Sequence, residues 1–78
     1  MTNINTFNAR KAGQKIRNLR QDAGMSAKQF AETIGSTEAS ICAYERGSRI
    51  PADRIKVLIA NYFEMSVQEI FFTATRGR

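Results

Sequence analysis

The apolar residues of this 78-residue chain recur at helical spacing rather than alternating with polar residues. The clearest stripe occupies positions i, i+3, i+4, i+7 and i+8, on Ile55, Leu58, Ile59, Tyr62 and Phe63. A second stripe steps by four, three and four residues through Ala12, Ile16, Leu19 and Ala23. No stretch alternates long enough to predict a strand. The pattern therefore predicts an all-α chain.

Capping residues and glycines divide this pattern into helices. Residues that can cap or open a helix precede the apolar stripes: Asn8, Ser26, Ser36 or Thr37, Pro51 and Ser66. Two of them begin capping boxes, because Gln29 and Glu69 follow Ser26 and Ser66 by three residues. Glycines follow the first three helices, at Gly24, Gly35 and Gly47. We expect one compact five-helix bundle over residues 9–72, between an N-terminal arm (1–8) and a flexible C-terminal tail (73–78).

Charge is distributed unevenly along the chain, which has a formal net charge of +5. The first 21 residues contain no acid and five basic residues, which are Arg10, Lys11, Lys15, Arg17 and Arg20. In the rest of the chain, basic and acidic residues are equal in number, so the whole positive excess lies in the first segment. A one-sided basic segment favours a polyanionic partner, and the alternative is a solvated helix face that maintains solubility. A membrane surface is disfavoured because the segment lacks a broad apolar face.

The residue types exclude several kinds of chemistry. The chain has no histidine and one cysteine, Cys42, so histidine-based catalysis and Cys/His zinc sites are excluded. We expect no enzyme, no cofactor and no metal. A lone thiol usually packs as a small apolar group, and redox sensing is the alternative for Cys42. The polar start of the chain predicts no signal peptide and hence a cytoplasmic protein.

Residues 27–46 have the pattern of a helix-turn-helix. Ala31 provides the small side chain where the second helix crosses the first, and Gly35 provides a left-handed turn residue. Apolar residues on both sides of the turn can fix the angle between the helices: Phe30, Ile34, Ile41 and Tyr44. The second helix can then protrude, and its exposed face fits a major groove about 12 Å wide.

A longer set of residues shares this spacing. It comprises Ile16-Arg17-Asn18-Leu19-Arg20, Gly24-Met25-Ser26, Phe30-Ala31-Glu32-Thr33-Ile34-Gly35, Ile41, Tyr44-Glu45-Arg46-Gly47, Pro51 and Met65-Ser66-Val67-Gln68-Glu69-Ile70-Phe71. With this set, residues 16–72 resemble the Cro/C1-type (Xre-like) helix-turn-helix family of bacterial and phage regulators. The resemblance implies a lambda-repressor-like five-helix fold. It also implies a sequence-specific transcriptional regulator, a repressor that binds a palindromic operator on double-stranded DNA as a homodimer.

The resemblance also assigns residues to DNA contacts. The helix that begins at Glu38 would be the recognition helix, with base-reading positions at Glu38, Ala39 and Ala43 and further contacts from Thr37 and Ser40. Phosphate contacts would come from the start of the preceding helix and from the loop after the recognition helix: Ala27, Lys28, Arg46, Gly47, Ser48 and Arg49. The basic bias adds Arg10 and Lys11 to the phosphate contacts, and a solvated helix start is the alternative for this pair.

Other positions have implied structural roles. The family pattern pairs Arg20 with Glu45 as a buried ion pair. Met65, Phe71 and Phe72 are expected mostly in the core, which Phe71 can help to close. Because two consecutive phenylalanines point apart on a helix, Phe72 is harder to bury, and the three residues can leave an apolar patch for dimer contact; packing against the first helix is the alternative. Tyr62 is expected mostly in the core.

The family pattern is not fully kept. Ala27 occupies a position where glutamine is frequent, and the implied reading face holds one acid, two alanines and small hydroxyls. This face predicts weak base selectivity, since it lacks the arginine, glutamine or asparagine that usually grasps a purine. It leaves an alternative function open, an antitoxin whose main partner is a protein toxin and which also binds its own operator.

Overall fold

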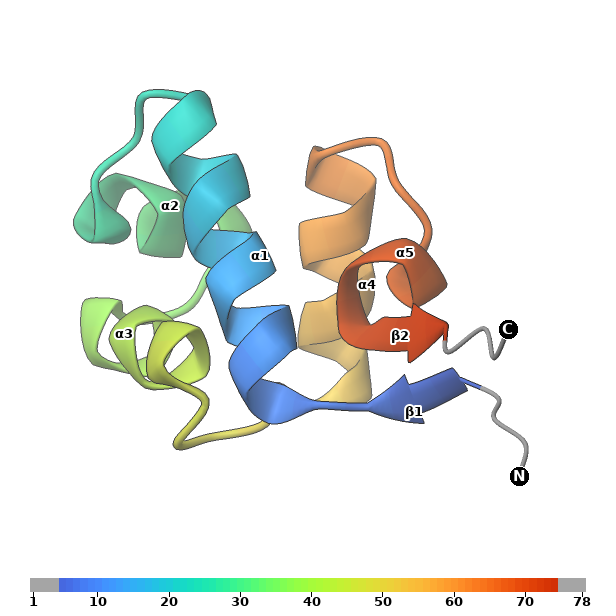
Figure 1. Cartoon of the computed structure of the whole chain (residues 1–78). Coiled ribbons are helices and arrows are strands. Elements are labelled where there is room, and N and C mark those ends of the chain that lie inside the picture. The colour runs from blue at the N-terminus through green and yellow to red at the C-terminus, as the bar shows by residue number, and fades with distance from the viewer. Residues whose placement is uncertain (1–4, 75–78) are drawn as a thin grey trace.

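The computed structural model describes residues 5–74 of the chain, and its side chains over residues 8–72. This part contains five helices, α1 (Ala9–Asp22), α2 (Ala27–Ile34), α3 (Glu38–Arg46), α4 (Asp53–Tyr62) and α5 (Val67–Phe71). In Figure 1, α1 lies across the middle of the molecule, with α2 and α3 on one side and α4 and α5 on the other. The predicted all-α five-helix fold is confirmed.

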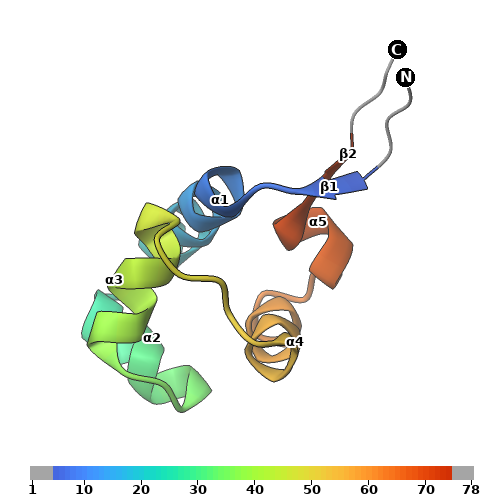
Figure 2. The ribbon, with the colours of Figure 1, turned by 90° about the horizontal axis from the view of Figure 1, so that it is seen from below.

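Two short strands, which the sequence pattern did not predict, join the two ends of the described chain. Strand β1 (Asn5–Phe7) pairs antiparallel with β2 (Phe72–Ala74), with Asn5 opposite Ala74 and Phe7 opposite Phe72. Figure 2 shows the pair beyond α5, on the far side of the molecule from α3. Three residues are too few to show an alternating pattern, so these strands carry no signal of their own. The predicted arm and tail thus meet in a strand pair, and their residues 1–4 and 75–78 lie outside the described residues.

Helix capping follows the sequence in four of the five helices. Asn8 Oδ1 accepts the Lys11 N–H at 3.0 Å, and Thr37 Oγ1 accepts the Ser40 N–H at 3.1 Å. Both capping boxes are formed, at Ser26 and at Ser66. The predicted start of the fourth helix is wrong. Pro51 is not in the first turn of α4, because Ala52 is the N-cap with an extended backbone and Pro51 precedes it as a buried loop residue. A proline φ fits an extended loop as well as a first helical turn.

The core gathers one face from each helix. Its fully buried large side chains are Phe30, Phe71, Ile16, Ile41 and Ile59. One expected core residue differs: Tyr62 is 45% exposed. Its ring packs edge-on against Phe63 at 5.0 Å between centroids, and its hydroxyl lies 3.6 Å from the Met25 sulfur. Tyr62 lies at the edge of the α4 stripe, so only one side of its ring reaches the core.

Helix α1 approaches the end of α3 closely because one of its residues has no side chain. Gly13 is buried, and a Cβ there would lie 2.2 Å from the Tyr44 carbonyl oxygen and 2.6 Å from that of Glu45. Gly47, which ends α3 with φ +79°, is also crowded, though less than Gly13: a Cβ there would lie 2.9 Å from the Arg10 Cα. The first turn of α1 and the loop after α3 are therefore held side by side.

Candidate nucleic-acid interface

The predicted helix-turn-helix is formed by α2, the turn and α3. Gly35 takes the left-handed conformation at φ 71° and ψ 37°, and the Ser36 N–H closes the turn on the Ala31 carbonyl at 2.8 Å. Every residue expected to fix the angle between the two helices is buried: Phe30, Ala31, Ile34, Ile41 and Tyr44. The core therefore holds α3 from one side only, which leaves its opposite side at the surface.

The surface side of α3 contains the predicted base-reading residues. Glu38 and Ala39 are exposed, as is the cap Thr37, whereas Ser40 and Ala43 are half-buried. Four of these five side chains are uncharged and short, so the face carries one charge, the Glu38 carboxylate. Ala39 and Ala43 lie one helical turn apart on one face of α3, whereas Thr37, Glu38 and Ser40 occupy other positions around its first turn.

An arginine from outside α3 reaches its first turn. Arg49, in the loop between α3 and α4, donates from Nη1 to Ser40 Oγ at 3.0 Å. The Thr37 hydroxyl donates to the same oxygen at 3.0 Å, while Thr37 Oγ1 accepts the Ser40 N–H. Sequence reasoning placed Arg49 with the phosphate-gripping loop and missed this contact, because the two partners are nine residues apart and the loop must fold back to join them.

Further cations border the α3 face. Arg10 is exposed in the first turn of α1, and its backbone packs against Gly47, whereas the exposed Lys11 lies on the opposite side of α1. Arg46 is exposed at the end of α3, and Figure 1 shows the following loop passing beneath the start of α1. The structure thus places Arg10 beside the loop of residues 46–49, which are far apart from it in sequence.

At the start of α2, only part of the expected phosphate site is available as side chain. Lys28 is exposed, but Ala27 is half-buried and packs against the core. Ala27 can therefore contribute its backbone N–H alone. The first N–H groups of a helix have no partner within it, so this end of α2 retains donors for an anion.

The implied ion pair of Arg20 and Glu45 is formed. Arg20 Nε donates to Glu45 Oε2 at 2.6 Å and Nη2 to Oε1 at 3.0 Å, while Nη1 donates to the Met25 carbonyl at 2.9 Å. The two side chains are 12% and 8% exposed. The hydrogen bond to Glu45 raises the pKa of Arg20 despite the opposing effect of burial. The pair joins α1, the loop before α2 and the end of α3, and its hydrogen bonds engage both side chains within the fold.

Because Arg20 is paired with Glu45, the other basic residues of the first 21 carry the positive excess, and they divide between two surfaces. Arg17 and Arg46 line a hollow of about 350 Å³ between α1 and α3, with Cys42 half-buried among them. Lys11 and Lys15 line a hollow of about 530 Å³ on the opposite side of α1. The bias therefore does not form one continuous surface, although the sequence concentrates it in one segment.

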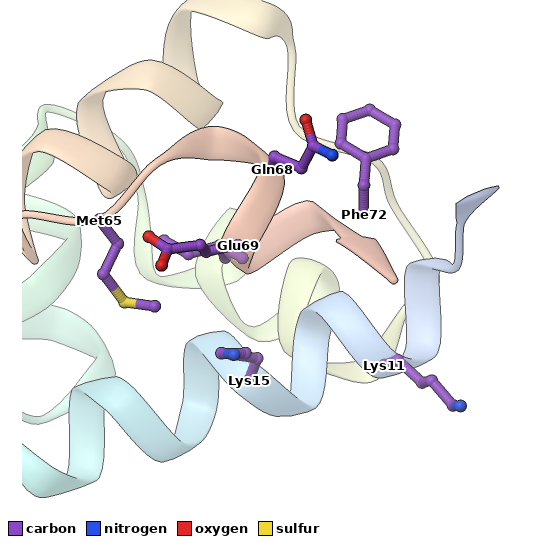
Figure 3. Close-up of a pocket in the computed structure, with 7 residues that line it drawn as sticks. Lys11, Lys15, Met65, Gln68, Glu69 and Phe72 are labelled. Carbon is purple, nitrogen blue, oxygen red and sulfur yellow. The ribbon is translucent and has the colours of Figure 1, made fainter. Parts of the chain in front are cut away.

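The predicted dimer patch is wrong for one of its three residues. Phe71 is 1% exposed and belongs to the core, because α5 turns this ring inward and leaves the following residue to begin β2. Met65 and Phe72 are half-buried and line the 530 Å³ hollow with Lys11, Lys15 and Glu69 (Figure 3). Whether they contact a second copy stays a prediction.

Two features are absent from residues 5–74, the part of the chain that the structure describes. No helix in this part of the chain is long and apolar enough to cross a membrane. The same residues hold no group of three or more Cys, Asp or Glu side chains arranged to bind a metal ion.

The chain is similar in sequence to known helix-turn-helix proteins. The family model described as helix-turn-helix (HTH_3) matches residues 16–70. An uncharacterised HTH-type transcriptional regulator of Bacillus subtilis, YgzD, is 29% identical over 58 residues, which cover 74% of this chain and 88% of YgzD.

Two solved structures extend the similarity. The restriction-modification controller protein C.AhdI from Aeromonas hydrophila is 27% identical with a TM-score of 0.73, covering 81% of this chain and 96% of C.AhdI. PlcR of Bacillus thuringiensis, solved in complex with the peptide PapR7 and DNA, is 26% identical with a TM-score of 0.72. This similarity covers 80% of the present chain and 22% of PlcR.

Proposed function

We propose that this chain, which belongs to the Cro/C1-type helix-turn-helix family, represses transcription at a palindromic operator. Members of this family are DNA-binding transcriptional regulators rather than enzymes. In this proposal it binds double-stranded DNA as a homodimer in the bacterial cytoplasm, with α3 in the major groove. The observation that carries the proposal is the free outer side of α3, bordered by Arg10, Arg46 and Arg49.

Affinity comes from the cations around that side. Arg10, Lys28 and Arg46 are exposed there, and the Ala27 N–H at the start of α2 adds a neutral donor. Lys11 is also exposed, but on the opposite side of α1, so its proposed phosphate contact needs DNA that extends past α1. Cations that neutralise phosphates release condensed counterions, so binding weakens steeply as salt concentration rises. Gly47 and Ser48 supply the loop that follows the backbone: the Ser48 N–H and hydroxyl both donate to the Ala43 carbonyl, at 3.0 and 3.3 Å, which fixes the course of this loop.

Base contacts come from the first turns of α3. Glu38 can accept a hydrogen bond from a cytosine N4 amine, and Ala39 and Ala43 offer methyl contacts to thymine. Thr37 and Ser40 are tied to each other, so the hydroxyls already hold a fixed geometry. Two copies would bind half-sites about 34–36 Å apart, one helical turn of DNA, with Met65 and Phe72 as the proposed dimer contact.

The antitoxin alternative has no observation in its favour among the described residues or the comparisons. The names of YgzD and C.AhdI describe a transcriptional regulator and a controller protein. We therefore retain the stand-alone regulator as the single proposal.

Selection of binding sites from a random duplex library tests it, at about 100 mM salt, where phosphate contacts still contribute. We expect two inverted half-sites about one helical turn apart. DNA that is retained without enrichment of any sequence would contradict the operator proposal. A single enriched half-site would contradict the dimer.

A further inference from the structure

The first turns of α3 lack a side chain that can recognise a purine. The outer side has alanines at 39 and 43, its arginine, Arg46, stands only in the last turn, and Glu38 in the first turn repels phosphate and accepts hydrogen bonds only. Guanine presents two acceptors in the major groove, O6 and N7, which a donor pair must match. If a guanine lies against the first turns of α3, its donors must come from a residue outside those turns.

Arg49, in the loop after α3, is the candidate for that donor pair. The loop of residues 46–49 turns back along α3: Gly47 takes φ +79°, and the Ser48 N–H bonds to the Ala43 carbonyl at 3.0 Å. The Arg49 side chain then reaches Ser40, near the N-terminal end of α3, where Nη1 donates to Oγ at 3.0 Å. Its guanidinium therefore lies beside the part of α3 that enters a groove most deeply in helix-turn-helix complexes.

We propose that Arg49 is a base-reading residue that recognises guanine, in place of the phosphate contact expected from its position in the loop. This inference rests on the proposed function, since it requires α3 to lie in the major groove. The guanidinium has five N–H donors, and one of them binds Ser40, so others are left to bind a base. The short side chains at 39 and 43 leave room beside the helix for a long side chain and a base edge.

Ser40 acts as the positioning residue for Arg49. The Ser40 N–H donates to Thr37 Oγ1, the Thr37 hydroxyl donates to Ser40 Oγ, and that oxygen accepts from Arg49. This chain of bonds directs the Ser40 acceptor toward the guanidinium. A free arginine side chain loses considerable rotamer entropy on binding, so holding the fork in advance reduces that loss.

A base-reading role and a phosphate role predict different effects of lysine. Lysine keeps the charge that a phosphate contact needs, but as a point charge it cannot match O6 and N7 with a planar fork. Arg49→Lys should therefore preserve general DNA affinity and lose selectivity at one G·C pair. A phosphate contact would survive the same substitution with its sequence preference intact.

The test repeats site selection with the whole chain as wild type, Arg49→Lys and Arg54→Lys. Arg54 is an exposed arginine of α4 with no part in the proposed interface, so it is the matched control. We expect wild type and Arg54→Lys to enrich the same motif, with one G·C pair in each half-site that Arg49→Lys no longer prefers. Discrimination at that pair should fall by about 5- to 150-fold, the range for one bidentate contact.

The outcomes separate this inference from the proposed function. If wild type enriches no sequence, the proposed function fails and the inference fails with it. If wild type enriches a motif that Arg49→Lys keeps unchanged, the operator proposal stands and the inference is overturned. Ser40→Ala gives a second measurement: we expect a smaller loss at the same G·C pair, and a loss at a different pair would overturn the positioning role.

Discussion

The inner and outer sides of α3 differ in how tightly their side chains are held. On the inner side, Ile41 is 0% exposed, Tyr44 is 7% exposed, and Glu45 is locked to Arg20 by two hydrogen bonds. On the outer side, the side chains are short and the bonds join Ser40 to groups that are themselves at the surface. The inner side fixes where α3 lies, and the outer side is free to meet a ligand. Substitutions on the two sides should therefore affect different measurements.

Glu45→Ala should have the largest effect, on the inner side. It leaves the part-buried Arg20 guanidinium, 12% exposed, with its bond to the Met25 carbonyl but without its carboxylate, and breaking a fully buried pair costs about 3–5 kcal/mol, so the lower end of this range applies. We expect the free energy of unfolding to fall by about 3 kcal/mol in urea titrations. Glu32→Ala, at an exposed position of α2, is the control and should stay within about 0.5 kcal/mol of wild type. A loss equal to that of the control would show that the pair does not hold α3.

Gly13→Ala tests the contact between α1 and the inner side of α3. Helix propensity alone predicts a gain of about 1 kcal/mol, because alanine is the better helix former. The structure predicts the opposite sign, since the new Cβ would lie 2.2 Å from the Tyr44 carbonyl oxygen. We expect a loss of about 2 kcal/mol, measured by thermal or urea unfolding. Gln14→Ala, exposed on the same helix, serves as control, and a stabilised Gly13→Ala protein would refute the close approach.

Arg46→Ala belongs to the outer side and should leave stability unchanged. Its expected effect is weaker binding to all duplexes, because the side chain neutralises phosphate rather than reading bases. The slope of log K against log salt concentration should become shallower by about 0.9, the value for one phosphate contact. Fluorescence anisotropy over a salt series measures this slope, with Arg54→Ala as control. An unchanged slope would remove Arg46 from the interface.

Glu38→Gln should have the smallest effect. The carboxylate repels phosphates, so its removal should tighten binding to non-specific duplex by about three-fold, within the usual size of a single surface charge effect. Preference for one cytosine should weaken at the same time, because a neutral amide replaces the carboxylate acceptor. Competition between a selected and a scrambled duplex measures both changes. Equal affinity of the two proteins for scrambled DNA would contradict this role.

Much of the fold could be predicted from local sequence. The capping boxes at Ser26 and Ser66, the turn at Gly35 and the buried residues around it are all formed as predicted. Each depends on residues three or four positions apart, which a helix brings together whatever the rest of the chain does. The pair of Arg20 and Glu45 came from the family resemblance, since no local spacing links residues 25 positions apart.

The candidate site was less predictable. Its positions along α3 followed from the resemblance, but Arg49 at Ser40 and Arg10 at Gly47 did not. Both contacts depend on the course of the loop after α3, which no periodic pattern describes. Phe71 was expected both to help close the core and to join the dimer patch, and the direction in which α5 packs leaves it only the first of these roles.

Local sequence was enough to specify the number and type of helices, the caps of four of them and the helix-turn-helix, because these depend on short-range spacing and backbone preference. Tertiary structure alone decided the strand pair of β1 and β2, the close approach at Gly13 and the reach of Arg49. These three features join segments that are distant in sequence, and their energy comes from contacts that exist only once the helices have packed.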